Sequence, residues 1–497
     1  MIRYSLLWGS IFGLALYAWR DWFKALCGVV ILMAILERSD MPRAMFGING
    51  LNPWNFLLGV VMLAWLFKRG REGLRWDMPW YLNVLLLIYL IVVLVAFWRM
   101  YTDRILLILM GDTTGSIVGT YLINTIKFVI PGLLFFDGAR TRSRFHLAVA
   151  SVLVLYVLIG VQTIRMVGPG SLLDGDALER RARKSLETQL GYHRTDVSMM
   201  LAGASWSVAL AGGSLLRSGA QRMGMVGLAL LLVLAQALTA GRAGYAAWVG
   251  VGFFLGAVRW RSAVFGLPVV VALLFYLAPG VKARFFQGIE TEDTLLGEAA
   301  IDQDEVTAGR ANIWPLVADK IKESPWVGFG RQAMVRTELT FEGQEDEEVG
   351  ERFNHPHNAY LEWLLDNGIF GALLVGPFYV VCMVIAVRLL RDHRSPVFVA
   401  AGALSGALLV AHLGSSIGGQ TFYPRESSVG MWCAFGLAFR AWVERRRLLG
   451  ADLPEGPFEP PAPPDPDEDE PAPRWRPRLA PEEGRTAPAG HHRSRVG

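Results

Sequence analysis

Residues 309–330 read GRANIWPLVADKIKESPWVGFG, and residues 355–371 read HPHNAYLEWLLDNGIFG. The two motifs enclose an acidic passage that has no regular apolar pattern. In the first motif, apolar residues recur at helical spacing from Ile313 to Ile321, which predicts a helix that ends before Pro325. The motifs therefore predict how the chain folds on either side of a long polar segment.

The second motif predicts a short amphipathic helix in front of a long apolar segment. Apolar residues from Tyr360 to Leu365 fall on one face, and Asn367 and Gly368 interrupt the pattern before the apolar segment begins. His357 lies just before this helix. The pattern therefore places an imidazole at the membrane surface.

Gly309 and Arg310 precede the first predicted helix. Unpaired backbone N–H groups, the positive helix dipole and a guanidinium at one helix start form a combination that suits phosphate. Arginines at helix starts are more often solvated surface charges, and the same reservation applies to a single loop histidine. Arg310 and His357 become candidates because each neighbours a surface helix in the large polar loop of a membrane protein.

The composition excludes a soluble globular domain. Hydrophobic residues make up 53% of the 497-residue chain and charged residues 19%, and the mean hydropathy is +0.35. The three cysteines lie inside apolar segments, so they indicate no disulfide framework. We expect an all-α polytopic bundle of about 12–14 transmembrane helices in a lipid bilayer, with no nucleic-acid partner.

Thirteen apolar runs approach the length that crosses a hydrocarbon core of about 30 Å. The first two are short and are also compatible with one re-entrant hairpin. The first has no small-residue cleavage site followed by a soluble domain, so we expect an anchor rather than a removed signal peptide. The runs are residues 4–19, 22–36, 51–67, 80–98, 117–136, 146–164, 197–213, 223–240, 243–258, 262–278, 369–387, 397–413 and 428–442.

Basic residues predict which side of the membrane each loop faces. One alternating set of short loops holds twenty basic residues and the opposite set holds six, Arg425 among them. By the positive-inside rule the first set is cytoplasmic, so the large loop faces the exterior or periplasm. With thirteen spans, the N-terminus faces outside as well.

These boundaries divide the chain into four predicted parts. Residues 1–278 hold the first ten spans, 279–357 the large, partly helical outer loop, 358–450 the surface helix and last three spans, and 451–497 a tail. The tail holds twelve of the 25 prolines and alternates PDPDEDE with PRWRPR without apolar periodicity. We expect it to be disordered and cytoplasmic.

The predicted spans contain few ionisable residues. Lys127 is the one charged residue near the middle of a span, and His412 lies toward an outer end. Coupled transporters keep several buried charges along their path, so this scarcity argues against a transporter. Lys127 either reaches the membrane surface, pairs with a carbonyl, or contacts substrate.

Arginines gather on the predicted outer face. Arg242 lies in LTAGRAGYAAW, in a tight turn between two spans, where it either reaches the membrane surface or meets a headgroup phosphate. A smaller outer loop carries a basic cluster that ends at Arg194. Such clusters are usually solvated, although they also attract anionic lipid or polyanionic glycan.

The chain has many predicted spans, TAGRAGY opens one of them, and the large outer loop ends in HPHNAYLEWLLDNGIFG. In this combination the chain resembles the O-antigen ligase and O-antigen polymerase superfamily. The motifs cover residues 195–390. The resemblance implies a bacterial inner-membrane glycosyltransferase of polysaccharide and lipopolysaccharide biosynthesis in the cell envelope. It implies a periplasmic large loop and transfer of a glycan from undecaprenyl pyrophosphate to an acceptor hydroxyl, with inversion and without a metal or other cofactor.

The resemblance also implies roles for individual residues. Arg242 and Arg310 match the arginines that bind pyrophosphate, and His357 matches the general base. His355 precedes it by two positions, so the sequence leaves open which of the two is the base. Arg194, Lys127, Arg425 and His355 are weaker candidates.

The chemistry supports these roles independently. Guanidinium groups stabilise the charge that develops on a departing pyrophosphate, and an imidazole can accept the proton of the attacking hydroxyl. A zinc site on the two histidines lacks a third ligand at the usual spacing. The sequence GYHRTDVSMM at residues 191–200 departs from the asparagine-rich segment of the family, and Asn358 is expected to cap a helix.

Several functions fit these observations. We favour a ligase that transfers a glycan to a lipid, glycan or protein acceptor, and a polymerase of the same superfamily is the alternative. A lipid-linked sugar flippase would explain the spans and arginines but not the base. A membrane scaffold would need neither the arginines nor the base.

Overall fold

The computed structural model describes residues 2–287, 289–290, 300–301, 313–342, 354–419 and 421–450. Arg310 and the tail 451–497 lie outside the described residues, as does the acidic passage at 343–353. The described helices belong to one unit, Met1–Gly456. The four-part division of the chain stays a prediction.

Every apolar run that the sequence suggested as a span is helical. The run at 117–136 is built from several pieces, because a π-helical turn and a short second helix interrupt it. The helices of these runs are α1 Ile2–Ala18, α2 Trp22–Leu36, α3 Pro53–Arg69, α4 Trp80–Thr102, α6 Thr114–Val118 with η1 Gly119–Ile123, α7 Asn124–Lys127 and α8 Ile130–Gly138, α9 Arg142–Val167, α11 Arg194–Ser207 with η4 Val208–Gly212 and α12 Gly213–Leu215, α13 Gly219–Ala237, α14 Arg242–Val258, α15 Arg261–Leu277, α21 Ala359–Leu390, α22 Pro396–Ser415 and α23 Val429–Leu448.

Within the described residues, seven helices are long and apolar enough to cross a membrane. An eighth is added if α15 and α16 (Pro279–Phe285), which bend by 110° at their junction, form one broken span. Leu7–Ala18, Trp22–Leu36 and Arg242–Val258 are shorter apolar helices. The prediction of an all-helical, multi-pass membrane protein is confirmed. Fewer helices than the expected number have a full crossing length because several predicted spans are short or broken.

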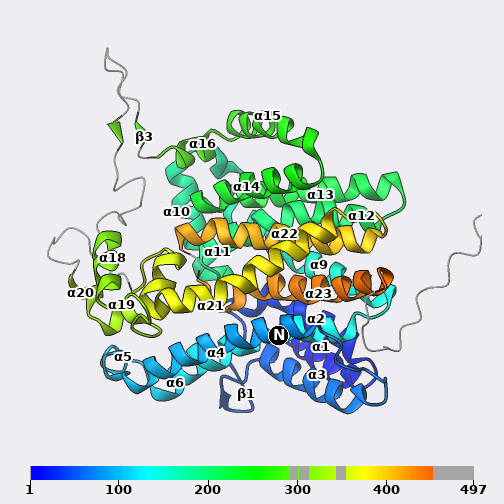
Figure 1. The fold of residues 1–497 in the computed structure, drawn as a ribbon. Coiled ribbons are helices and arrows are strands. Elements are labelled where there is room, and N and C mark those ends of the chain that lie inside the picture. The colour runs from blue at the N-terminus through cyan, green and yellow to red at the C-terminus, as the bar shows by residue number, and fades with distance from the viewer. Residues whose placement is uncertain are drawn as a thin grey trace, which may run out of the picture. The chain divides into compact units, whose positions relative to one another are not determined.

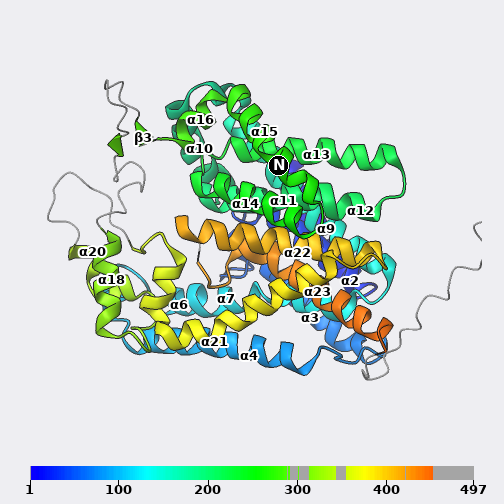
Figure 2. The same cartoon turned by 45° about the horizontal axis from the view of Figure 1, so that its top comes forward.

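The long helices pack side by side, and small helices gather at one end of the bundle (Figures 1 and 2). We call this the outer end, following the positive-inside prediction, and the opposite end the inner end. The small elements are α5 Ile105–Leu109, η2 Pro169–Leu173, α10 Gly175–Ser185, η3 Leu186–Leu190, α16, α18 Ile313–Glu323, α19 Ala333–Arg336 and α20 Leu339–Glu342. Two antiparallel pairs are the strands of the described chain: β1 Ala44–Met45 with β2 Ile48–Asn49, and β3 Ile289–Glu290 with β4 Ala300–Ile301.

The helix α21 breaks where the sequence predicted a change from a surface helix to a span. Gly368 has φ 63° and ψ −169°, so the backbone there leaves the helical conformation and exposes peptide groups on both sides of the break. Residues 325–330 enter this gap and make four backbone hydrogen bonds of 2.7–3.0 Å with residues 365–370. The bonds join Phe329 to Leu365, Gly330 to Asp366, Ile369 to Pro325 and Phe370 to Trp326.

This close approach requires a glycine in each of the two contacting segments. Gly328 has φ 60°, and a Cβ there would lie 2.6 Å from the carbonyl oxygen of Leu365; on Gly368 it would lie 2.4 Å from the carbonyl carbon of Trp326. We expect Gly328→Ala and Gly368→Ala each to destabilise the protein by roughly 1–3 kcal/mol and lower its unfolding temperature in detergent. Gly376→Ala, on the same helix with nothing within 4 Å, is the control. If both variants unfold like the control, the contact is not needed.

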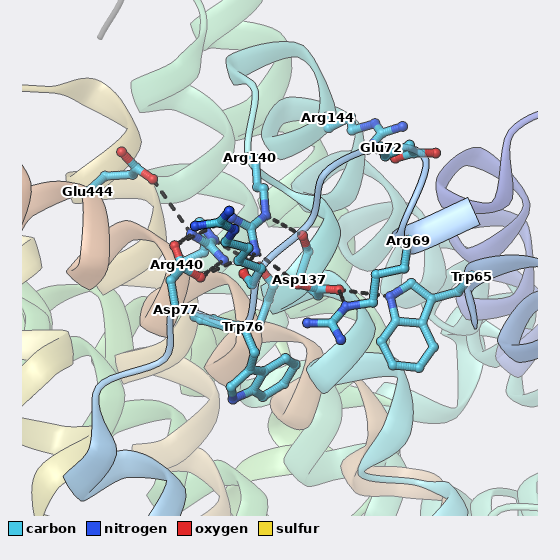
Figure 3. Close-up of polar contacts among 12 residues, drawn as sticks. Trp65, Arg69, Glu72, Trp76, Asp77, Asp137, Arg140, Arg144, Arg440 and Glu444 are labelled. Atoms are coloured by element: carbon cyan, nitrogen blue, oxygen red, sulfur yellow. Dashed lines mark hydrogen bonds and ion pairs between the residues drawn. The ribbon is translucent and has the colours of Figure 1, made fainter. Parts of the chain in front are cut away.

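The inner end is held by a buried network of ion pairs (Figure 3). Arg440 donates to both carboxylate oxygens of Asp77 at 2.7 Å, and Arg447 reaches the same carboxylate at 2.8 Å. Arg140 connects Asp77, at 3.3 Å, with Asp137, at 2.9 Å. Because the side chains of Arg440 and Asp77 are 1% and 2% exposed, loss of either would leave buried charges of the network only partly compensated.

We therefore expect Arg440→Met to destabilise the protein by roughly 3–5 kcal/mol. The measurement is thermal unfolding of the purified protein in detergent. Arg446→Met is the matched control, because Arg446 lies on the same helix and makes no ion pair among the described residues. An unfolding temperature for Arg440→Met equal to that of the control would contradict the importance of the network.

Candidate functional site

The candidate site is built around the first turn of α11, at the outer end of the bundle. His193 caps the helix by accepting a hydrogen bond from the backbone N–H of Thr195. The next three side chains reach different parts of the site: Arg194 contacts α10, Thr195 lies near Gly419, and Asp196 pairs with a loop arginine. The positive end of the helix dipole adds to the attraction for anions.

Three guanidinium groups from three helices converge beside this turn. Arg194 of α11 and Arg284 of α16 share the carboxylate of Glu179, at 2.8 and 2.6 Å. Arg242 is the first residue of α14 and donates to the backbone oxygen of Gln287 at 3.2 Å, and the side chain of Gln287 accepts from Arg284. The charges of Arg194 and Arg242 both act on Arg284.

His357 lies in a tight turn directly before α21. Its φ of 49° is in the left-handed region, and its backbone N–H donates to Nδ1 of His355 at 3.3 Å. The two rings lie 3.9 Å apart between centroids. His355 is exposed and His357 is half-buried, so His357 is the histidine that faces into the protein.

Neighbouring groups fix this turn. Asn358 caps α21 by accepting from the backbone N–H groups of Tyr360 and Leu361, as the sequence predicted. Trp314 of α18 donates to the carbonyl oxygen of Pro356 at 2.9 Å. The helix of the first motif and the turn of the second motif are therefore in direct contact.

The turn after α22 brings His357 toward α14. A Cβ on Gly419 would lie 3.6 Å from Nδ1 of His357 and 3.8 Å from the hydroxyl oxygen of Thr195. On the preceding residue, Gly418, a Cβ would lie 2.4 Å from Cβ of Ala243, the residue after Arg242. The sequence-predicted histidine and arginine therefore flank the same two-glycine turn, η5 (Ser416–Gly418) and Gly419.

The next segment, Thr421–Ser428, crosses the outer end and is called the strap here. Arg425 in the strap pairs with Asp196 at 3.1 Å and with Glu426 at 2.9 Å. Burial by itself lowers the pKa of Arg425, but the two carboxylates raise it above its usual value. Burial likewise raises the pKa of Glu426, but the guanidinium of Arg425 holds that pKa below its usual value. Both groups are thus kept charged beside the start of α11.

A second buried network anchors the strap to the broken helix. Tyr423 donates to Asp366 at 3.0 Å and accepts from Asn367 at 2.9 Å. Arg331 lies with its guanidinium 4.1 Å from the centre of the Tyr423 ring, and it donates to Thr125 of α7 at 2.8 Å. These contacts join the strap, α21 and the outer loop into one support behind His357.

Lys127 lies apart from the arginine cluster. Its ammonium donates to the side-chain oxygen of Asn55, in the first turn of α3, at 3.0 Å. Of the alternatives that the sequence left open for Lys127, the structure shows the pairing with a carbonyl, that of the Asn55 side-chain amide.

The structure thus gathers Arg194 and Arg242 beside the start of α11 and packs the η5 turn against His357 and against Ala243, the residue after Arg242. Arg425 is linked to the same helix start through Asp196. Arg310 lies outside the described residues, and its position stays a prediction. Sequence reasoning missed Arg284 and Asp196. The spacing of Val281 and Phe285 around Arg284 would have indicated a short helix with an inward arginine, whereas the partner of Asp196 lies more than two hundred residues away.

Among the described residues no group of three or more His, Cys, Asp or Glu side chains could hold a metal ion.

Residues 227–376 match the family model for O-antigen ligase. Over this region the match supports the O-antigen ligase superfamily. The matched region holds Arg242, Arg284 and His357, whereas Arg194 and Arg425 lie outside it. No curated protein matches the chain. Together with the apolar helices, the match supports a multi-pass membrane protein of the O-antigen ligase-like glycosyltransferase type.

Proposed function

We propose that this O-antigen ligase-like protein transfers a glycan from undecaprenyl pyrophosphate to an acceptor hydroxyl, at the periplasmic face of a bacterial inner membrane. The observation that carries the proposal is the gathering of Arg194, Arg242 and Arg284 beside the start of α11, with the η5 turn packed against His357 and against Ala243, the residue after Arg242. An anion-binding group and a base thus flank one place, as a displacement reaction requires.

In this mechanism the arginines bind the pyrophosphate of the donor. Negative charge builds on the leaving oxygen as the bond to the sugar C1 breaks, and fixed guanidinium donors stabilise that charge. Removal of one such donor typically costs about 10²–10³ in rate. Arg310 joins this group in the proposal, by its place in the family motif.

His357 acts as the general base. The acceptor hydroxyl oxygen attacks C1 as the bond from C1 to the pyrophosphate oxygen breaks, and the pyrophosphate leaves with the electron pair. The hydroxyl proton passes to the imidazole of His357. A single displacement inverts the configuration at C1, and the guanidinium groups supply the positive charge that the leaving group needs.

An apolar groove that includes Phe285, next to Arg284, supports a lipid donor. A cavity of about 810 Å³ lies between α13, α14, α15 and α16, and its lining is almost wholly apolar, with Trp248, Phe253, Phe275 and Phe285 among its residues. Phe285 adjoins Arg284. We propose that the groove takes part of the undecaprenyl chain, which places the attached pyrophosphate beside the arginine cluster.

Ligase and polymerase share these residues and differ in the acceptor. We favour the ligase, and the material that accumulates in a deletion strain separates the two: unattached long chains indicate a ligase, and single repeat units indicate a polymerase. A flippase would move the lipid-linked glycan without needing His357. Protease access to the large loop from the periplasm tests the proposed sidedness.

The base is tested by comparing the two adjacent histidines. We expect His357→Ala to lower turnover about 10²–10⁴-fold at saturating substrate, because the acceptor proton loses its base. The measurement is glycan release from undecaprenyl pyrophosphate and attachment to acceptor by purified protein in liposomes. His355→Ala is the matched control and should keep most of the turnover. The reverse ranking would transfer the role of base to His355, and wild-type turnover by both variants would remove the enzyme proposal.

The arginine cluster gives a second test. We expect Arg284→Gln and Arg242→Gln each to reduce the rate about 10²-fold or more, because each removes a pyrophosphate donor. Arg181→Gln is the control, because Arg181 is an exposed arginine of α10, the helix that carries Glu179. A single-turnover assay with the undecaprenyl pyrophosphate-linked donor separates binding from chemistry. Rates equal to the control for both variants would exclude these arginines from the donor site.

A further inference from the structure

A polar cavity and an apolar groove lie along α2 and α9, which pack side by side in the bundle (Figures 1 and 2). The groove has a volume of about 250 Å³, and its lining from α1, α2, α3 and α9 is almost wholly apolar. Neither space shares a lining residue with the groove proposed for the donor lipid. The cavity has a volume of about 500 Å³ and is lined by Arg38, Gln162, Arg165, Met166 and Gln189.

The spacing of the lining residues places the cavity directly beyond the outer end of the groove. On α9, Leu158 lines the groove, and Gln162 and Arg165 line the cavity. On the neighbouring helix, Ile35 lines the groove, and Arg38, just after the end of α2, lines the cavity. Residues three, four and seven positions apart share one face of a helix. Each helix therefore presents apolar and then polar side chains on the same side.

Gln162 joins the two spaces. Its side-chain nitrogen donates to the carbonyl oxygens of Ala34, at 2.9 Å, and Leu158, at 3.1 Å, and both of these residues line the groove. Its side-chain oxygen accepts from Arg38 at 2.9 Å. One amide thus lies at the boundary between the cavity and the groove, and it fixes α2 against α9 at this level.

The cavity carries an excess of positive charge. Arg38 pairs with Asp40 at 3.0 Å, whereas Arg165 is exposed and makes no ion pair with any residue that the structure describes. The lining that the structure describes includes no acidic side chain. Asp40 and Gln162 accept three hydrogen bonds from Arg38, which has five N–H donors, so both arginines keep donors for a ligand.

These groups match the phosphodiester of a phospholipid. Guanidinium groups bind phosphate through charge-assisted hydrogen bonds, and carboxamides exchange hydrogen bonds with phosphate oxygens and hydroxyls. The candidate span α9 ends at Val167, so Arg165 lies two positions from its end, at the level of lipid headgroups. A soluble anion would occupy the cavity and leave the groove empty. A lipid fills both, because its chain enters apolar space while its phosphate meets the arginines.

We propose that the cavity binds the headgroup of an anionic phospholipid from the surrounding bilayer and that the groove takes part of one of its chains. The bound lipid contacts η3 through Gln189, and η3 leads through Gly191 and Tyr192 to the first turn of α11. Tyr192 donates to the carbonyl oxygen of Met33 in α2 at 2.8 Å. The lipid therefore braces the connection between α2 and the start of α11.

Binding is measured by native mass spectrometry of the full-length protein, delipidated in detergent and titrated with lipid. The probes are phosphatidylglycerol, phosphatidylcholine with the same chains, and glycerophosphoglycerol, which is the first headgroup without chains. We expect phosphatidylglycerol to bind about tenfold more tightly than either of the others, because phosphatidylcholine carries a repelled ammonium and the soluble headgroup buries no chain.

The arginines are tested by substitution. We expect Arg38→Gln and Arg165→Gln each to weaken the binding of phosphatidylglycerol about tenfold, through lost charge-assisted hydrogen bonds. Arg180→Gln is the control, because Arg180 is exposed on α10 and does not line the cavity. Arg165 is exposed and makes no ion pair within the described chain, so Arg165→Gln keeps the test decisive if Arg38→Gln unfolds.

The groove is tested with a matched pair on α9. Leu158 is 38% exposed and lines the groove, so Leu158→Trp fills that space; Leu147 is 36% exposed on the same helix and does not line it. We expect Leu158→Trp to weaken the binding of phosphatidylglycerol about tenfold, as when roughly two methylenes leave the groove, and Leu147→Trp to leave it unchanged.

Three results would overturn the site. Equal affinity for phosphatidylglycerol and phosphatidylcholine would exclude recognition of an anionic headgroup. Glycerophosphoglycerol that binds as tightly as phosphatidylglycerol would indicate a site for a free phosphodiester rather than a lipid. Binding of phosphatidylglycerol that is unchanged in both Arg165→Gln and Leu158→Trp would place the lipid elsewhere on the protein.

Discussion

The docking of residues 325–330 into the broken turn of α21 is the contact on which the outer end depends. A helix that simply continued through Gly368 would have no free peptide groups to offer, and the outer loop would have no fixed return point. Residues 325–330 form hydrogen bonds with the peptide groups that the break exposes, so these groups are not left unpaired in an apolar environment. The same contact fixes α18 at one side and the turn of His357 at the other.

Local features of the sequence predicted much of this arrangement. The apolar period of α18, its end before Pro325, the cap at Asn358 and the break near Gly368 all follow from neighbouring residues, and all were confirmed. The contact between the two motifs could not be predicted in the same way. Glycines at 328 and 368 are visible in the sequence, but their mutual fit is a property of two backbones in space.

The candidate site, too, was predicted from the sequence only in part. Arg242 and His357 were identified because each lies in a motif at the start of a helix, and the η5 turn packs against both His357 and Ala243, the residue after Arg242. The spacing of Val281 and Phe285 indicates a short helix with an inward Arg284, but the burial of Arg284 and its shared partner Glu179 are visible only in the structure. The pairing of Asp196 with Arg425 depends on the strap crossing the bundle. Such a path is set by packing of distant helices and leaves no short pattern in the sequence.

The ion-pair network at the inner end has a consequence for biosynthesis. Asp77 and Arg440 are separated by 363 positions, so the carboxylate enters the membrane region long before its partner has been translated. Until the last helix emerges, Asp77 can be neutralised only by water, lipid headgroups or Arg140, which is itself engaged with Asp137. The network is therefore completed only when α23 is inserted. If translation ends before α23, the carboxylate of Asp77 stays hydrated and lacks Arg440.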